Sequence, residues 1–132
     1  MHASCVEWEG RGLLIAGPSG SGKSSLALEL MAYGAGLVAD DRTFLWDKGA
    51  LWARAPESLP RAIEGRGFGL LKAELTGQAQ IVAAVALPRR NAARMPQYDE
   101  ISLLSQSIPL LHRPASGPFG AMLLQYLKLG LL

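Results

Sequence analysis

The chain has 132 residues, of which 49% are hydrophobic and 18% charged, and its formal net charge at pH 7 is +2. This composition is typical of a folded globular protein and excludes an intrinsically disordered chain, and the length fits a single domain over residues 1–132. The net charge is small and the arginines are scattered, so no basic stripe indicates nucleic acid or a membrane surface as a partner.

Cysteine content and hydropathy favour the cytoplasm. The single cysteine, Cys5, has no partner for an intramolecular disulfide, which suits a reducing compartment. The N-terminal residues lack the basic segment and apolar run of a signal peptide. The longest apolar runs, 81–87 and 121–132, are too short to span a bilayer. We therefore expect a soluble cytoplasmic protein.

The first third of the chain predicts strand, loop, helix and strand in that order. Residues 3–9 alternate loosely as a strand, and the short apolar run 13–17 is typical of a buried strand. Residues 24–33 are rich in helix formers, and Gly34 stands where a C-terminal cap glycine is common. The run 36–40 predicts a second buried strand.

The remaining chain predicts more strands and one helix. Residues 42–55 indicate a hairpin, and residues 63–69, with glycine at every second position, predict a loop. The run 79–87 is a buried strand that ends at Pro88, and residues 101–112 give one or two strands interrupted at Pro109. These elements predict an α/β fold around a mixed β-sheet.

The last helix is expected over residues 119–129 and is rich in leucine. Its leucines either pack this helix on the sheet or form an interface between copies of the chain, and the sequence favours packing with some association.

The stretch GPSGSGKS has the spacing G-x-x-x-x-G-K-S of a phosphate-binding P-loop, between a predicted strand and a predicted helix. In such a loop the backbone N–H groups and the helix N-terminus attract phosphate oxygens. The lysine reaches the β- and γ-phosphates, and the last hydroxyl binds Mg²⁺. The candidate nucleotide-binding residues are Gly17, Pro18, Ser19, Gly20, Ser21, Gly22, Lys23 and Ser24.

Two adjacent carboxylates, Asp40 and Asp41, follow the second buried strand. In P-loop folds this strand end commonly supplies a carboxylate for Mg²⁺. Neighbouring residues on a strand point in opposite directions, so we expect one aspartate to hold the metal or its water and the other to accept a proton from an attacking hydroxyl. Farther along, Glu64 and Arg66 either complete a metal–phosphate site or form an ordinary solvated pair.

Taken together, residues 1–42 and the segment IEGRGFG resemble the catalytic domain of the HPr serine kinase/phosphorylase family. That family combines a P-loop, a doubled aspartate and an E-x-R-G-x-G signature. The resemblance implies an ATP-dependent, Mg²⁺-requiring enzyme that phosphorylates a serine of HPr, the phosphocarrier of the sugar phosphotransferase system, and that often also runs the reverse phosphorolysis. It also implies a homo-oligomer, commonly a hexamer, and a fold similar to the nucleotide domain of phosphoenolpyruvate carboxykinase.

The resemblance also assigns roles to residues. Lys23 contacts the phosphates, and Ser24 and Glu64 correspond to the metal-binding positions. Asp41 corresponds to the proton acceptor for the serine hydroxyl, Asp40 to its neighbour in the site, and Arg66 to the signature arginine, placed with the nucleotide-binding residues. His2 corresponds to a histidine of the family's catalytic site.

By the same resemblance, Arg94 corresponds to a family arginine that meets the substrate protein, with Arg89 and Arg90 as competitors for that role; the alternative is that all three are ordinary solvated arginines. Compared with the family, the sequence starts without a regulatory domain and has Ser25 where an acidic residue is usual. We therefore expect a truncated single-domain form.

Two other functions stay open at the level of sequence. A carboxykinase-type small-molecule phosphotransferase would need further arginines and a second metal site, which the sequence does not show. A non-catalytic, ATP-binding regulatory module is favoured by the short length, but the intact Lys23, Asp41 and His2 count against it.

Overall fold

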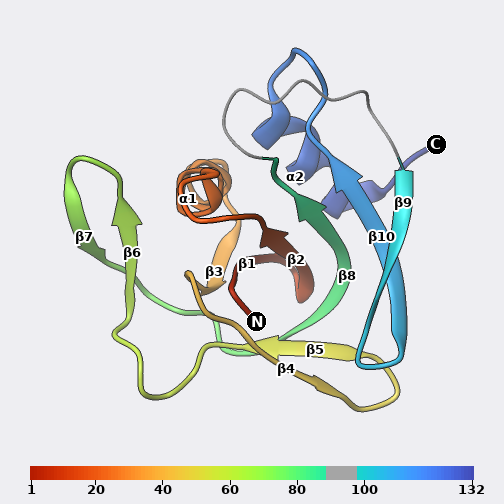
Figure 1. The fold of residues 1–132 in the computed structure, drawn as a ribbon, viewed down its shortest axis with the longest axis horizontal. Coiled ribbons are helices and arrows are strands. Elements are labelled where there is room, and N and C mark those ends of the chain that lie inside the picture. Colours follow the sequence, from red (N-terminus) through yellow and green to blue (C-terminus); the bar gives the residue numbers. More distant parts are fainter. Residues whose placement is uncertain (89–97) are drawn as a thin grey trace.

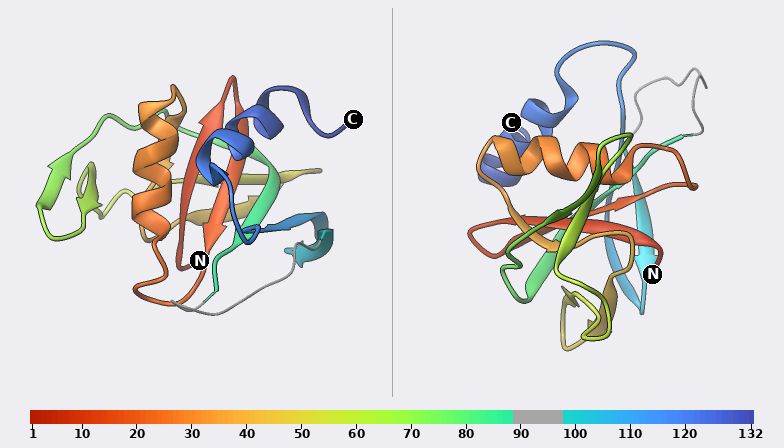
Figure 2. Two further views of the ribbon diagram at one scale, coloured as in Figure 1. Left: turned by 90° about the horizontal axis from the view of Figure 1, so that it is seen from above. Right: turned by 90° about the vertical axis from the view of Figure 1, so that its left-hand side faces the viewer.

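The computed structural model describes residues 1–88 and 98–132, which form a central sheet with helices on one face and a β-hairpin on the other (Figures 1 and 2). The main path of the sheet runs β3–β1–β2–β8–β10–β9. Its strands are β1 (Ala3–Trp8), β2 (Arg11–Ala16), β3 (Gly36–Ala39), β8 (Ala79–Ala86), β9 (Tyr98–Leu103) and β10 (Gln106–His112). Strand β8 runs parallel to β2 and β10, whereas β1 is antiparallel to β2 and β3. The predicted mixed sheet is therefore confirmed.

Two helices, α1 (Lys23–Ala32) and α2 (Phe119–Leu129), cover the same face of this sheet. Leu30 of α1 and Leu127 of α2 are fully buried in one apolar cluster with Ile15 of β2. Burial of this apolar surface is the main force that holds the helices on the sheet. Helix α2 thus packs on the sheet as expected. In the described part of the chain, no helix combines the length and apolar character needed to cross a bilayer.

The opposite face of the sheet is covered by the hairpin β4 (Phe44–Asp47) and β5 (Leu51–Arg54). Strand β5 also pairs with the beginning of β8, which ties the hairpin to the sheet. Leu51 and Ala53 pack there against Leu14 of β2 in a second apolar cluster. The sheet is therefore buried on both faces, which explains why its inner strands are almost continuously apolar.

The segment with alternating glycines differs from the predicted loop, because it forms a short hairpin of β6 (Ala62–Gly65) and β7 (Gly69–Lys72). Gly67 has a φ of 75°, a left-handed conformation that favours glycine, and Phe68 N donates to the Gly65 carbonyl across the turn. The glycines thus make a tight connection instead of a long loop. In Figure 1 this hairpin stands out beside α1.

Pro109 does not interrupt a strand, as the sequence had suggested, but lies inside β10 opposite Glu100 of β9. Strand β10 pairs with β8 only from Leu110 to His112, so Pro109 precedes that ladder. A proline, which has no N–H to donate, is tolerated at such a one-sided position of a sheet.

Cys5 lies in β1 and is fully buried between the sheet and the β4–β5 hairpin. Burial raises the pKa of its thiol far above the ordinary value, and the nearby carboxylate of Glu7 adds to this effect. The folded protein therefore keeps this proton at a pH where the unfolded chain loses it. The stability from this group is complete below about pH 8.5 and declines as the pH rises above that value.

We expect Cys5 to react with a thiol reagent such as iodoacetamide roughly 100-fold more slowly in the native protein than in urea, because alkylation needs an accessible thiolate. Mass spectrometry of timed samples at pH 8 measures both rates, and the single cysteine makes the signal unambiguous. Rapid labelling of the native protein would show that β1 is not packed as described.

Candidate active site

The direction of the strands brings three separate segments to one edge of the sheet. His2 precedes β1, the glycine-rich loop follows β2, and the two aspartates follow β3. Because β1 is antiparallel to both β2 and β3, its first residue lies where those strands end, with Ala3 opposite Ala16. The strand order thus explains how residues about 40 positions apart in sequence become neighbours.

The phosphate loop is shaped by its glycines. A Cβ atom at Gly17 would lie 2.6 Å from Ser21 Oγ and 2.8 Å from the Leu87 carbonyl oxygen, so no larger residue fits there. Gly22 has a φ of 97° and forms the N-cap of α1 without a side-chain cap. The first turn of α1 contains no acidic residue, so its partial positive charge is not neutralised by the helix itself. Such a helix end attracts anions.

Lys23 lies in this loop region with its side chain turned back over the loop. Its Nζ donates to the carbonyl oxygens of Gly17 at 3.0 Å and Pro18 at 3.2 Å, and the residue is only 6% exposed. The ammonium group is therefore held next to the loop that its motif predicts will bind phosphate.

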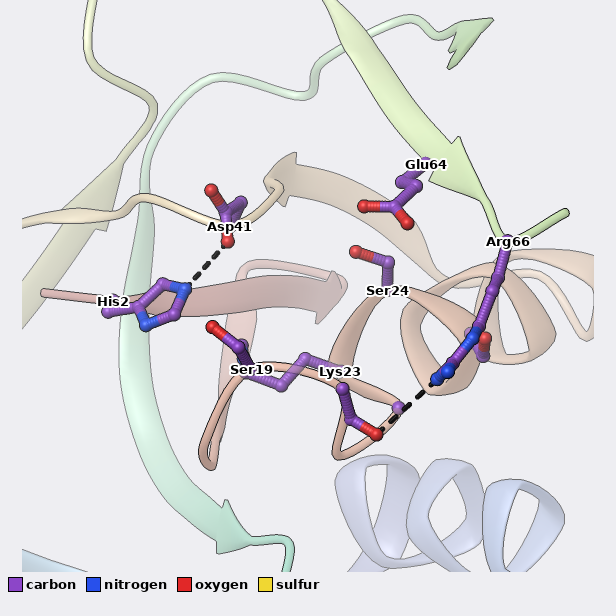
Figure 3. A pocket seen from close by; sticks show the side chains of 10 residues that line it. His2, Ser19, Lys23, Ser24, Asp41, Glu64 and Arg66 are labelled. Carbon is purple, nitrogen blue, oxygen red and sulfur yellow. Dashed lines mark hydrogen bonds and ion pairs between the residues drawn. The ribbon is translucent and has the colours of Figure 1, made fainter. Parts of the chain in front are cut away.

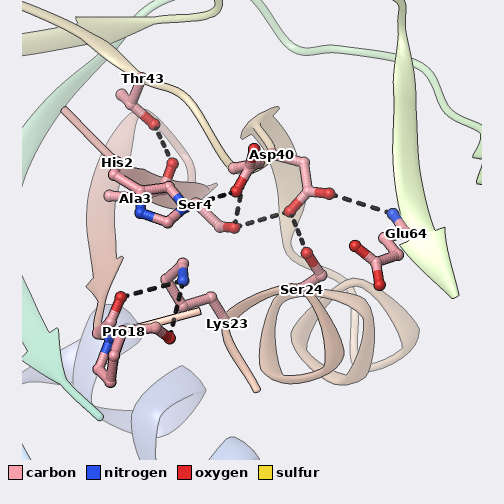
Figure 4. Close-up of polar contacts among 11 residues, drawn as sticks. His2, Ala3, Ser4, Pro18, Lys23, Ser24, Asp40, Thr43 and Glu64 are labelled. Carbon is pink, nitrogen blue, oxygen red and sulfur yellow. Dashed lines mark hydrogen bonds and ion pairs between the residues drawn. The ribbon is translucent and has the colours of Figure 1, made fainter. Parts of the chain in front are cut away.

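Asp40 is the centre of a hydrogen-bond network that links three elements (Figure 4). Its Oδ1 accepts from Ser4 Oγ of β1 and from Ser24 Oγ of α1, each at 2.7 Å. Its Oδ2 accepts from the backbone N–H of Glu64 in β6 at 3.1 Å. Hydrogen bonds to a carboxylate are among the stronger ones in proteins, so this network fixes Ser24 relative to β1 and β6.

Asp41 faces a different partner. Its Oδ1 lies 2.7 Å from Nε2 of His2, and both side chains are exposed to solvent. The two aspartates thus contact different groups, whereas the different roles expected for them stay a prediction. Strand alternation is not the cause of the different contacts, because β3 ends at Ala39. The cause is the left-handed conformation of Asp41, with a φ of 66°, held by a hydrogen bond from its N–H to Ser4 Oγ.

The segment around His2 is fixed by backbone contacts. Thr43 Oγ1 donates to the Ala3 carbonyl at 2.8 Å, and Met1 N donates to the Thr43 carbonyl at 2.8 Å. These contacts align residues 1–3 with residues 41–43. The position of His2 opposite Asp41 is thus part of the fold.

The β6–β7 hairpin closes the other side of the site. Arg66 Nη1 donates to the Gly20 carbonyl of the phosphate loop at 3.4 Å, and the carboxylate of Glu64 points toward Ser24 (Figure 3). One cavity collects these groups from all four segments. Its lining residues include His2, Ser19, Lys23, Ser24, Asp41, Glu64 and Arg66.

Most candidate residues therefore meet in one place. The exceptions among the described candidates are Asp40, which accepts a hydrogen bond from Ser24, and the loop residues Gly17, Pro18 and Ser21, none of which lines the cavity. Arg94, like its competitors Arg89 and Arg90, lies outside the described residues.

The oxygen atoms around Ser24 fit Mg²⁺. Within residues 1–88 and 98–132, no three His, Cys, Asp or Glu side chains cluster as a metal site made only of protein groups. Mg²⁺ is usually held by one or two carboxylates together with waters and substrate phosphates, so such a cluster is not needed. The Ser24 hydroxyl and the Glu64 carboxylate are hard oxygen donors beside the phosphate loop.

Ser4 is the functional residue that sequence reasoning missed. It is fully buried, and its hydroxyl donates to Asp40 and accepts from the N–H of Asp41, so it connects the two aspartates. A polar residue in the otherwise apolar start of β1 was the available signal, because a buried hydroxyl needs a partner. The partner could not be named without knowing that β1 lies beside β3.

Comparison with known proteins gives a consistent result. The family model described as HPr Serine kinase C-terminal domain matches residues 1–94. The HPr kinase/phosphorylase of Cupriavidus necator is 36% identical over 123 residues, which cover 86% of this chain and 37% of that protein. The HPr kinase/phosphorylase of Streptococcus thermophilus is 45% identical over 73 residues, which cover 54% of this chain and 24% of that protein. The chain therefore covers less than two fifths of the length of either relative.

A solved structure confirms the fold class. The Hpr(Ser) kinase/phosphatase from Coxiella burnetii superposes with a TM-score of 0.79, covering 97% of this chain and 92% of that one. The sequence identity is 22%, so this similarity concerns the fold alone.

We expect Ser4→Ala to lower the free energy of unfolding by about 1–3 kcal/mol, because it removes one of the three hydrogen bonds to the Asp40 carboxylate and leaves the Asp41 N–H without its acceptor. Ser4→Thr keeps the hydroxyl and should lose less. Urea denaturation measures both. The matched control is Ser107→Ala, which removes an exposed serine–carboxylate hydrogen bond to Glu100 and should change stability by no more than about 0.5 kcal/mol. Equal losses at Ser4 and Ser107 would contradict the role given to Ser4.

Proposed function

The chain belongs to the HPr serine kinase C-terminal domain family, and on that basis we propose that it is an ATP-dependent kinase that phosphorylates a serine of the carrier protein HPr. The observation that carries this proposal is the His2–Asp41 pair, which lies in the same cavity as Lys23 and Ser24 of the phosphate loop. A phosphate-binding loop alone is shared by many ATPases. A carboxylate across the cavity from the loop adds a group that can take a proton from a hydroxyl.

The donor side of the proposed reaction is the phosphate loop. The N–H groups at the start of α1 and the ammonium of Lys23 bind the phosphates of ATP, and Arg66 adds a second cation from the β6–β7 turn. Mg²⁺ held by Ser24 and Glu64 would neutralise charge on the phosphate oxygens. Asp40, through its bond to the Ser24 hydroxyl, orients that metal-binding group.

The acceptor side is the His2–Asp41 pair. The serine oxygen of the acceptor forms a bond to the γ-phosphorus while the bond to the ADP oxygen breaks, and Asp41 accepts the serine proton. His2 orients the Asp41 carboxylate through the 2.7 Å contact. In the reverse direction, in which inorganic phosphate attacks the phosphoserine, Asp41 would return the proton to the serine oxygen, so phosphorylase activity uses the same groups.

The remaining expectations belong to the same proposal. Residues 1–132 act as one catalytic domain, the protein works in the cytoplasm within a phosphotransferase system, and copies of the chain associate as a homo-oligomer. Arg94 would meet the acceptor protein. Light scattering of the purified protein tests the association directly.

We expect the protein, incubated with Mg–ATP and HPr, to transfer one phosphoryl group to a serine, identified by mass spectrometry. Asp41→Asn should lower this rate by about 10²–10⁴-fold, because the proton acceptor is lost. The matched control is Glu74→Gln, an exposed carboxylate between β7 and β8, which should keep the wild-type rate.

Three other outcomes would point elsewhere. Turnover of oxaloacetate-like acids with ATP would favour a carboxykinase-type phosphotransferase. Tight ATP binding without transfer to any carrier would favour a regulatory module. An Asp41→Asn variant as active as the Glu74→Gln control would contradict the role of Asp41.

We also expect removal of Mg²⁺ with EDTA to abolish transfer while leaving the fold intact, because the described strands and helices pack through apolar clusters and residues 1–88 and 98–132 contain no cluster of three His, Cys, Asp or Glu side chains for a structural metal. Circular dichroism before and after chelation checks the fold, and added Mg²⁺ should restore the rate. Full activity in excess EDTA would contradict the metal role of Ser24 and Glu64.

A further inference from the structure

A second hollow adjoins the active-site cavity. Met1 and Arg42 line this hollow, whereas the residues next to them in sequence, His2 and Asp41, line the cavity. Its apolar lining, which we call the apolar groove, consists of Met1, Phe44, Leu45, Pro56, Leu103 and Leu104. The two hollows are therefore lined by consecutive residues of the same two segments, residues 1–2 and 41–42.

The apolar groove exposes large side chains to solvent. Leu104 is 53% exposed, Phe44 48% and Met1 42%. Single exposed apolar residues are common on protein surfaces, but several that line one hollow indicate an interaction site. Arg42 is the one charged residue among the described lining residues, so the groove suits an apolar surface that is neutral or acidic around it.

The backbone at Leu104 gives an independent observation. Leu104 and Ser105 connect β9 to β10 and have φ values of 48° and 69°. A two-residue turn of this kind favours Asn-Gly, because both positions need positive φ, and leucine is a poor choice. This turn lies beside the β4–β5 hairpin (Figure 1), where Gln106 Nε2 donates to Asp47 Oδ1. A residue held in an unfavourable conformation with its side chain in an open groove indicates a functional requirement.

We propose that the apolar groove docks the acceptor protein through apolar side chains next to the serine that is phosphorylated. This inference rests on the proposed function. The donor phosphates take the side of the cavity formed by the P-loop, so the serine must approach the His2–Asp41 pair from elsewhere. A folded acceptor is larger than the cavity, and its surface around the serine must extend over the adjoining residues, Met1 and Arg42. The apolar groove continues from those residues.

The decisive variant is Leu104→Asn. Asparagine tolerates the left-handed conformation better than leucine, so the variant should unfold at a higher urea concentration, yet it removes the apolar side chain from the groove. A second variant, Phe44→Thr, removes another lining side chain while keeping a residue that favours strands. The matched control is Leu129→Asn, at the end of α2, where the leucine is 79% exposed and does not line the groove.

The experiment measures HPr binding by calorimetry, the acceptor KM and the ATP KM in the transfer assay, and mass by light scattering. For Leu104→Asn and Phe44→Thr we expect the HPr Kd and the acceptor KM to rise about tenfold, with the ATP KM unchanged. The control should stay within about twofold of the wild type.

Several results would overturn the docking proposal. An unchanged HPr Kd in both groove variants would do so, as would an equal rise in the control or an absence of HPr binding to the wild type. A change of mass in the groove variants without a change in HPr affinity would instead assign the groove to a second copy of the chain. A wild-type protein that binds HPr in a Leu104-dependent way but transfers nothing would support docking and overturn the proposed kinase activity. The two proposals therefore fail separately.

Discussion

The hydrogen bonds to the Asp40 carboxylate are the contact on which the arrangement of the site depends. They connect Ser4 of β1, Ser24 of α1 and the backbone of Glu64 in β6 through a single side chain. Each of these elements is packed by its own apolar contacts, but burial is not directional and does not set the position of a hydroxyl to a fraction of an ångström. The charged hydrogen bonds supply that direction. Asp40 therefore fixes the relative positions of the oxygen atoms at this edge of the sheet, which apolar packing alone leaves loosely defined.

The antiparallel orientation of β1 brings two kinds of chemical group to this edge of the sheet. Strand β2 delivers the phosphate loop, and β1, which runs the other way, delivers His2 to the same edge. The cations Lys23 and Arg66 and the carboxylates of Asp41 and Glu64 consequently line a common cavity. Groups of both signs close together suit a reaction in which negative phosphate and a departing proton must be held at the same time.

The sequence predicted those features that depend on local pattern. The helix after the glycine loop and the apolar strands were predictable because periodicity and cap residues are local signals. The IEGRGFG hairpin was not, because alternating glycines weaken a strand, and its pairing depends on the turn at Gly67. Pro109 was misread because a missing N–H disrupts a strand only where a neighbouring strand would accept its hydrogen bond, and β8 pairs with β10 only after Pro109. Ser4 was missed because its role exists only once β1 and β3 are paired.

The position of Lys23 has a consequence for ligand choice. Its ammonium already bonds two carbonyl oxygens of its own loop, so a ligand must compete with them for this cation. Neutral carbonyls are weaker acceptors than phosphate oxygens, and the exchange is favourable only for a ligand with concentrated negative charge. Nucleosides and weakly charged anions gain little from it. The backbone of the loop thus makes this cation selective for ligands with concentrated negative charge.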